Sequence, residues 1–317
     1  MQKYIFSIMT AFAVSLLFCR LLIPILRRLK AGQNILVYVK EHKSKGGTPT
    51  MGGIAFVFAA IISAFLFVKN ADRSLIVTLV VALSFMIVGL LDDFLKRKHK
   101  ENLGLRAWQK FVFQMGIAVF CGLYCYRAGC TELNIPFMRK TLDVAWWIIP
   151  LSAFVFVAIV NAVNLTDGLD GLAAGTSVPF FGLLGVLILL QNGTQNLAMT
   201  SFCVMGSLLA YLLFNVHPAS VFMGDTGSLA LGGFGGCICV FSGNTLYLPI
   251  LGICFVFSVI SVIVQVIYYK ATGGKRVFLM APIHHHFQKK GFSESRIAYA
   301  YFLITSLVGA LCVAVLG

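Results

Sequence analysis

Five carboxylates in a mostly apolar chain have types and positions that could do chemistry. Each lies near the point where an apolar run begins or ends; they are Asp92, Asp93, Asp167, Asp170 and Asp225. A charge at the bilayer centre costs roughly 2.5–3.5 kcal/mol on insertion scales, so these side chains are expected at a membrane surface. Adjacent carboxylates such as Asp92 and Asp93 repel each other unless a cation lies near them. A divalent cation or a lysine could provide that positive charge. A role in simply ending the helix is the weaker interpretation, because a negative charge is unfavourable at the C-terminal end of the helix dipole.

Asp225 lies in the segment Phe222–Ser228, where Gly224 and Gly227 would let the backbone approach a ligand closely. The alternative is helix capping, with Asp225 or Thr226 at the N-cap position. Both roles can hold together, because a helix N-terminus also suits a phosphate group. The segment therefore indicates a phosphate-binding turn, a helix start, or both.

A second polar segment, Asn164–Gly171, separates two apolar runs. Asp167 and Asp170 are three positions apart, so they face one side of the first turn if a helix begins near Thr166. Asn164 supplies amide donors and an acceptor for a base or a sugar. Two carboxylates exceed what one helix N-terminus needs, which favours binding of a polar ligand or a metal.

Three consecutive histidines, His284, His285 and His286, follow Pro282 and are hard to explain by packing alone. They could donate hydrogen bonds to a phosphate or ligate a metal. Zinc is the weaker choice, because the aspartates elsewhere in the chain are hard oxygen ligands that suit Mg²⁺. The glycine-rich segment Lys45–Gly53 carries a lysine, as phosphate loops do, but it lacks P-loop spacing, which disfavours ATP binding by that route.

The composition indicates the kind of scaffold that must position these residues. The 317-residue chain is 59% hydrophobic and 11% charged, whereas soluble proteins carry about 25% charged residues. It is therefore expected to be a polytopic integral membrane protein. The net charge of +14 could suggest nucleic acid, but the lysines and arginines lie in short connectors, as the positive-inside rule predicts. No nucleic-acid partner is expected, although some of these cations could hold an anionic substrate.

Ten apolar runs approach the roughly 20 residues that a membrane span needs. They are Ile5–Leu26, Gly52–Val68, Leu75–Leu91, Trp108–Tyr124, Ala145–Val160, Thr176–Leu190, Leu197–Phe214, Leu229–Val240, Leu246–Tyr269 and Ile297–Leu316. The eighth is short and glycine-rich, so it is the least secure span, and its glycines could instead allow close helix packing. Lysine and arginine are concentrated after the first, third and ninth runs, which predicts both termini outside. We expect one all-α domain, 1–317, with about ten transmembrane helices and every candidate residue on the cytoplasmic side.

Five motifs, in this order, resemble those of the polyprenyl-phosphate N-acetylhexosamine-1-phosphate transferases, over nearly the whole chain. They are Gly47–Gly53, Leu91–Phe94, Asn161–Ala173, Phe222–Ser228 and Met280–Phe287. The triple-histidine form is similar to the branch that uses muramoyl-pentapeptide donors. The resemblance implies a cytoplasmic active site in the inner (plasma) membrane of a bacterium, and a homodimer. It also implies Mg²⁺-dependent transfer of phospho-MurNAc-pentapeptide from UDP-MurNAc-pentapeptide to undecaprenyl phosphate, with release of UMP, as a step of peptidoglycan synthesis.

The same resemblance implies roles for individual residues. The metal would bind Asp225, and the catalytic residues would be Asp92, Asp93, Asp225 and His284. Uridine contacts would fall on Asn164, Leu165, Asp167, Gly168 and Asp170, with Phe222 against the uracil. The rest of the substrate pocket would be lined by Lys45, Thr50, Lys96, Asn215, Gly224, Ser228, Gln265, His285 and His286.

A secondary transporter of an anionic solute is the alternative hypothesis. Transporter sites usually lie near the bilayer midplane within broken helices, often with an internal repeat. Here the acids lie at the ends of the spans and no repeat is visible, which favours the enzyme. In the enzyme, Asp92 could orient or deprotonate the acceptor phosphate, or act as a covalent nucleophile.

Overall fold

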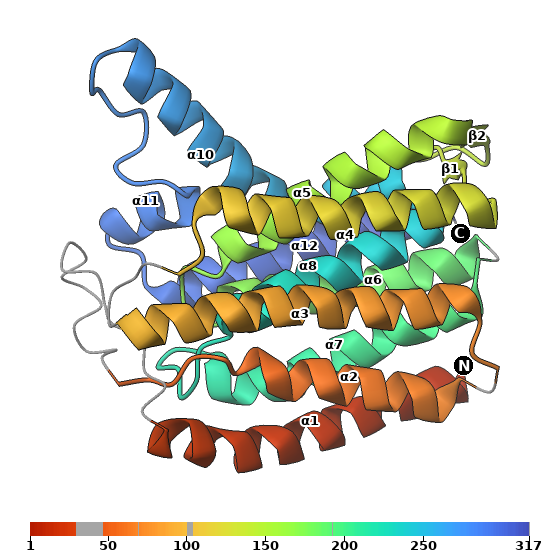
Figure 1. Cartoon of the computed structure of the whole chain (residues 1–317), viewed down its shortest axis with the longest axis horizontal. Helices are drawn as coiled ribbons and strands as arrows, with labels where there is room; N and C mark the ends of the chain where they lie inside the picture. The colour runs from red at the N-terminus through yellow and green to blue at the C-terminus, as the bar shows by residue number, and fades with distance from the viewer. Residues whose placement is uncertain (30–46, 69, 100–103, 192, 317) are drawn as a thin grey trace.

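In the computed structural model the chain folds into long helices that lie side by side along one direction (Figure 1). The structure describes residues 1–29, 47–68, 70–99, 104–191 and 193–316. The ten long helices are α1 (Gln2–Arg28), α2 (Gly53–Phe67), α3 (Arg73–His99), α4 (Ala107–Ala128), α5 (Ile148–Thr166), α6 (Leu172–Leu190), α7 (Gln195–Asn215), α8 (Gly224–Phe241), α10 (Ile253–Ala271) and α12 (Glu294–Leu316). Each predicted apolar run lies on one of them, and the ninth is divided, because α9 (Leu248–Leu251) precedes α10. The all-α prediction is confirmed.

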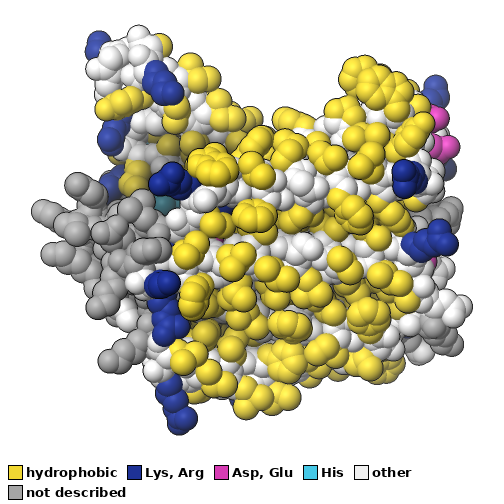
Figure 2. All heavy atoms as spheres, in the orientation of Figure 1, with side chains coloured by type: hydrophobic (Ala, Val, Ile, Leu, Met, Phe, Trp, Pro, Cys, Tyr) yellow, Lys and Arg dark blue, Asp and Glu magenta, His cyan; other side chains and the backbone are white. Residues whose placement is uncertain are grey.

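Eight of these helices, within the residues that the structure describes, are long and apolar enough to cross a membrane. α2 has only 15 residues and α8 has 18, many of them glycine, so the count of ten crossings stays a prediction. The visible face carries a broad hydrophobic belt, with lysine and arginine side chains gathered toward its ends (Figure 2). Large apolar side chains that are exposed, such as Leu66, Phe154 and Leu307, suit lipid rather than water. The protein is therefore a polytopic membrane protein.

Helix α8 lies at the centre of the bundle, and every residue of it from Thr226 to Phe241 is buried. Its glycines explain how a helix so poor in large side chains is packed. A Cβ added at Gly232 would lie 2.5 Å from the Cα of Val160 on α5, and one at Gly236 would lie 2.7 Å from the ring of Phe156. Small residues allow helix backbones to approach in this way. The sequence-based interpretation of these glycines as packing residues is confirmed.

The two ends of the bundle differ. Both chain termini, together with the hairpin of β1 (Glu132–Asn134) and β2 (Thr141–Asp143), lie at one end, whereas α11 (Ile283–Lys289) and the C-terminal end of α3 lie at the other (Figure 1). Termini at a common end agree with an even number of crossings. Which side of the membrane they face stays a prediction. The candidate residues therefore belong to connectors and helix ends opposite the termini.

Candidate active site

The acidic centre is the place where the end of α3 meets the start of α8. We use this name for Asp92, Asp93 and Asp225, whose carboxylate oxygens lie within 4.8 Å of one another. Asp92 and Asp93 are 1% and 4% exposed. The two backbones come close because Gly89 has no side chain: a Cβ there would overlap the carbonyl group of Asp225. Tertiary packing thus joins two acidic motifs that are distant in the sequence.

Asp93 caps the start of α8 from outside that helix. Its Oδ2 accepts hydrogen bonds from the Thr226 amide N–H at 3.0 Å and the Thr226 hydroxyl at 2.7 Å, and its Oδ1 accepts the Asp225 N–H at 3.2 Å. Gly224 permits this contact, because its φ is +71° and a Cβ would overlap the Asp93 carboxylate. The alternative in which Asp225 or Thr226 is itself the N-cap is wrong: the helix begins at Gly224, so both residues lie in its first turn, where Asp225 pairs with Lys96 and Lys110.

Two lysines bridge the remaining carboxylates. Lys96 Nζ lies 2.7 Å from Asp92 Oδ2 and 3.1 Å from Asp225 Oδ2. Lys110 Nζ lies 3.1 Å from Asp92 Oδ2 and also pairs with Asp225 Oδ2. Both ammonium groups therefore compensate the charges of Asp92 and Asp225, which would otherwise repel each other. A cation near Asp92 is what the sequence analysis expected.

Lys110 is a candidate functional residue that the sequence reasoning missed. No sequence motif marks this lysine. A usable signal existed, since Lys110 lies inside the apolar run Trp108–Tyr124. A cation within a spanning segment usually has a partner or a function.

Asn164 holds Asp225 from the opposite side. Its Nδ2 donates to Asp225 Oδ1 and to Ser228 Oγ, each at 2.9 Å. One turn earlier, Asn161 and Gln114 pair their side-chain amides, with Asn161 Nδ2 2.7 Å from Gln114 Oε1, and so join α5 to α4. In this structure Asn164 and Ser228 therefore orient the key carboxylate, and their contact with substrate stays a prediction.

The glycine-rich segment before α2 runs beside the segment before α8. The Phe222 N–H donates to the Pro49 carbonyl at 2.8 Å, and the Gly52 N–H donates to the Phe222 carbonyl at 2.9 Å. Thr50 is buried, and a Cβ at Gly224 would lie 2.6 Å from its hydroxyl, so this threonine borders the acidic centre. Lys45, predicted to line the pocket, lies outside the described residues.

The three histidines have three different surroundings on α11. His284 is fully buried, and neither ring nitrogen has a hydrogen-bond partner among the described residues. His285 Nδ1 lies 3.0 Å from Gln288 Oε1, and His286 Nδ1 accepts the Leu279 N–H at 3.1 Å. The histidine rings reach the polar loop after α5, because a Cβ at Gly168 would lie 2.5 Å from His284 Nε2 and 2.9 Å from His285 Nε2.

Burial, and then the neighbouring His285, lower the pKa of His284 to about 3. The imidazole is therefore neutral at physiological pH. As a neutral ring it can accept one hydrogen bond and donate another. A catalytic part for His284 stays a prediction.

This lowered pKa predicts an acid-dependent loss of stability that His284→Gln removes. Below about pH 6.5 His284 is protonated in the unfolded chain but not in the folded chain. The free energy of unfolding therefore decreases, and the protein becomes less stable, as the pH falls toward 3. Between pH 7.5 and 5.0 the wild type should lose about 2 kcal/mol more than His284→Gln. Thermal unfolding in detergent at the two pH values measures this, with His286→Gln as the control that keeps the wild-type slope. Equal acid sensitivity of wild type and His284→Gln would contradict the assignment.

The remaining predicted residues lie around these groups. Asp167 ends α5 near Leu165, and burial followed by the negative charges of Asp225 and Asp93 raises its pKa. Asn215 Nδ2 donates to the Val221 carbonyl at 3.0 Å and so shapes the segment before α8. These contacts orient loops beside the acidic centre, and the predicted ligand contacts stay predictions.

Gln265 holds the backbone of the connector that follows α10. Its Oε1 accepts the N–H groups of Val277 and Phe278 at 3.1 and 2.9 Å. These residues belong to the connector that leads from α10 to α11, where Phe278 packs edge-on against His286. Gln265 and His286 thus both hold this connector in place, and their contact with substrate stays a prediction.

An apolar cavity of about 400 Å³ lies between α5, α10 and the turn formed by η3 (Thr245–Tyr247) and α9. Its lining is almost entirely hydrophobic and includes Phe154, Val155, Ile159, Phe255 and Ile263. Phe154 and Ile263 are strongly exposed, so the cavity opens on the outer, lipid-facing surface. Such a lining suits a hydrocarbon chain.

The donor set of the acidic centre fits a hard divalent cation. Carboxylate oxygens suit Mg²⁺, and the three acids converge. Asp92 Oδ2 is buried, and its partners within the described ranges are the ammonium groups of Lys96 and Lys110. Asp93 already accepts three hydrogen bonds from the start of α8. Asp225, helped by Asp92, is therefore the best-suited ligand.

Comparison with known proteins gives a consistent result. The family model for glycosyl transferase family 4 matches residues 75–243. A phospho-N-acetylmuramoyl-pentapeptide-transferase from Caldanaerobacter subterraneus subsp. tengcongensis is 41% identical over 305 residues, 96% of each chain. Proteins of the same name from Clostridium perfringens (strain SM101) and Listeria monocytogenes serotype 4b (strain CLIP80459) are 43% and 44% identical over 306 residues. These alignments cover 96% and 95% of this chain and 94% of each relative.

Proposed function

The chain belongs to glycosyl transferase family 4 and to the family of the phospho-N-acetylmuramoyl-pentapeptide-transferases, and we propose that it catalyses their reaction at the acidic centre. It transfers phospho-MurNAc-pentapeptide from UDP-MurNAc-pentapeptide to undecaprenyl phosphate, which gives lipid I and UMP in peptidoglycan synthesis. The observation that carries this assignment is the convergence of three acids and two lysines from α3, α4 and α8. Solute transport, the alternative from the sequence, is not supported by these relatives.

The lysines are suited to hold the donor diphosphate. Lys96 and Lys110 lie next to Asp225, which is the most exposed of the three acids in the centre. Both lysine side chains also keep some access to solvent. Phosphoryl transfer is catalysed largely by positioning and by compensation of charge on the phosphate oxygens. The lysines therefore supply the positive charge, and Asn164 keeps Asp225 in its orientation.

In the transfer, an oxygen of the undecaprenyl phosphate attacks the β-phosphorus of the donor. A new P–O bond forms there, and the bond from that phosphorus to the oxygen bridging the two donor phosphates breaks, so UMP leaves with that bonding pair. A phosphate monoester is already largely ionised near pH 7, so a general base is not required. Asp92 orients or deprotonates the acceptor, or acts as a covalent nucleophile in a two-step route. Trapping a phosphosugar on Asp92 would distinguish the two-step route.

Mg²⁺ is the proposed cofactor, with Asp225 as its ligand and Asp92 beside it. When bound, it would neutralise phosphate charge and polarise the P–O bonds. The two lysines then share this charge compensation. Asp93 keeps Asp225 in position by accepting hydrogen bonds from the first backbone N–H groups of α8.

The apolar cavity between α5 and α10 is the proposed seat for part of the acceptor's prenyl chain. Its lining is hydrophobic and it opens on the lipid-facing surface, so a lipid could enter sideways from the bilayer. We also propose a homodimer in the bacterial inner (plasma) membrane, with the acidic centre facing the cytoplasm, where the soluble donor is available. The cation-rich connectors support this orientation.

The direct test is UMP release from UDP-MurNAc-pentapeptide and undecaprenyl phosphate by the full chain in detergent, with Mg²⁺ and with a chelator. Release that needs both substrates and Mg²⁺ is expected. Absence of UMP release from folded protein would defeat the proposal. Cysteine labelling from either side of sealed vesicles tests the orientation, since residues beside Asp92 and His284 must be labelled from the same side.

A further inference from the structure

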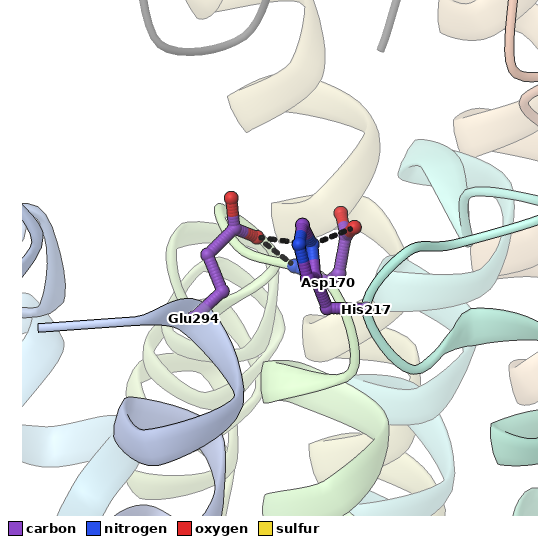
Figure 3. Close-up of side chains that lie close together, drawn as sticks. All are labelled: Asp170, His217 and Glu294. Atoms are coloured by element: carbon purple, nitrogen blue, oxygen red, sulfur yellow. Dashed lines mark hydrogen bonds and ion pairs between the residues drawn. The ribbon is translucent and has the colours of Figure 1, made fainter. Parts of the chain in front are cut away.

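A second charged cluster lies beside the histidine helix, away from the acidic centre. It comprises Asp170 after α5, His217 after α7 and Glu294 at the start of α12, and these side chains point toward one another (Figure 3). Asp170 and Glu294 are 3% and 9% exposed at their side chains, whereas His217 is 45% exposed. The sequence analysis named Asp170 but neither His217 nor Glu294.

The contacts make this cluster a clamp on Asp170. Glu294 Oε2 accepts the Asp170 main-chain N–H at 2.9 Å. On the other side, Asp170 Oδ2 lies 3.0 Å from His217 Nδ1 and accepts the Ala219 N–H at 3.1 Å. Two connectors and the start of α12 are thus joined at one residue of the polar loop.

Helix capping does not account for Glu294. The Ser293 hydroxyl oxygen accepts the Arg296 N–H at 3.4 Å, so α12 has its own cap. The Glu294 carboxylate instead extends sideways to the loop (Figure 3). A buried carboxylate is unfavourable unless its oxygens accept hydrogen bonds, so a specific set of donors must hold it.

The same carboxylate also reaches the histidines. Glu294 Oε1 accepts the side-chain amide of Gln288 at 3.4 Å, and Gln288 Oε1 lies 3.0 Å from His285 Nδ1. The loop returns to this helix, because Gly168 packs against the ring nitrogens of His284 and His285. One oxygen of Glu294 therefore holds the loop and the other holds α11.

We propose that Glu294 is a positioning residue for donor binding. It keeps the Asp167–Gly171 loop in register with the histidine helix, so that loop and histidines present their polar groups to the nucleotide together. The inference rests on the proposed function, because it concerns the donor of that reaction. Glu294 touches no reacting atom, so its loss should weaken donor binding more than the chemical step.

The test compares the steady-state kinetics of Glu294→Ala and Glu294→Gln in the full chain. Glu294→Ala should raise the KM for UDP-MurNAc-pentapeptide about 10-fold, with kcat within about 2-fold and the KM for undecaprenyl phosphate unchanged. Glu294→Gln keeps one acceptor oxygen and should recover part of the donor affinity. Gln288→Leu breaks the path from Glu294 to His285 but leaves the contact of Glu294 with the Asp170 N–H, so it should raise the donor KM less than Glu294→Ala does. Glu132→Ala, an exposed acid on the hairpin at the opposite end, is the matched control.

A purely structural role would lower the melting temperature and kcat together and leave the donor KM unchanged, which would overturn the proposal. If Glu294→Ala does not fold, unchanged donor KM in both Glu294→Gln and Gln288→Leu overturns it equally. Failure of the proposed function is a different result, because the wild type would then release no UMP.

Discussion

Replacing Asp225 with asparagine is expected to abolish Mg²⁺-dependent UMP release, with kcat/KM lowered by roughly 10³-fold. The substitution keeps the size of the side chain but removes the charge between Lys96 and Lys110. It also weakens the oxygen that is best suited to hold the metal, since a neutral amide is a poorer ligand for a hard cation than a carboxylate. Both donor binding and charge compensation should therefore fail together.

The comparison needs a matched control and a readout besides turnover. Asp143→Asn removes an exposed acid at the opposite end of the bundle, and Asn can still accept the Ala145 N–H, so activity should be unchanged. Thermal unfolding of Asp225→Asn should show whether the fold is intact, and Mg²⁺ should stabilise the wild type against unfolding more than this variant. Near-normal UMP release from folded Asp225→Asn would defeat the assignment of the acidic centre.

Replacing Lys110 with methionine is expected to lower kcat/KM by roughly 10²-fold. Methionine keeps much of the length and the apolar stem but removes the ammonium group that pairs with both Asp92 and Asp225. The remaining cation, Lys96, would then face two carboxylates by itself, and the donor diphosphate would lose one of its two positive partners. Lysine is a compact point charge, so arginine should restore activity only in part.

Lys98→Met is the control for this prediction, because Lys98 is exposed near the end of the same helix as Lys96. UMP release is measured for both variants at several donor concentrations. If Lys110→Met retained the kinetics of Lys98→Met, its ion pairs would be only a structural feature of the helix contact, and the role given to Lys110 in donor binding would be wrong.

The apolar runs and polar motifs predicted much of this structure because they depend on local chemistry. Each predicted run is helical, the ninth in more than one piece, since hydrocarbon surroundings require that backbone groups bond within the segment. The triple histidine and the aspartate motifs identified the residues that surround the acidic centre and the loop beside it. The family is also confirmed, because several short motifs in a fixed order are more specific than any one of them.

Residue roles were harder to predict than residue identities. Asp92 and Asp93 are adjacent residues of the same type, so the sequence does not distinguish them. In the structure Asp93 caps α8, whereas Asp92 pairs with two lysines. Asn164 faces Asp225, and Gln265 binds the backbone of a connector. Lys110 carries no motif at all. Each of these outcomes depends on which helix faces which, and sequence spacing does not contain that information.

The class of protein, the helical runs and the supply of carboxylates, lysines and histidines could all be predicted from the order of residues. These follow from the partitioning of apolar and charged side chains between lipid and water, which acts on each segment separately. Helix packing, in contrast, was needed to show that Asp92, Asp225, Lys96 and Lys110 lie together and that Glu294 links Asp170 to the histidine helix. The physical reason is close packing: glycines such as Gly89 let two helices touch, and only that contact brings distant charges within range of each other.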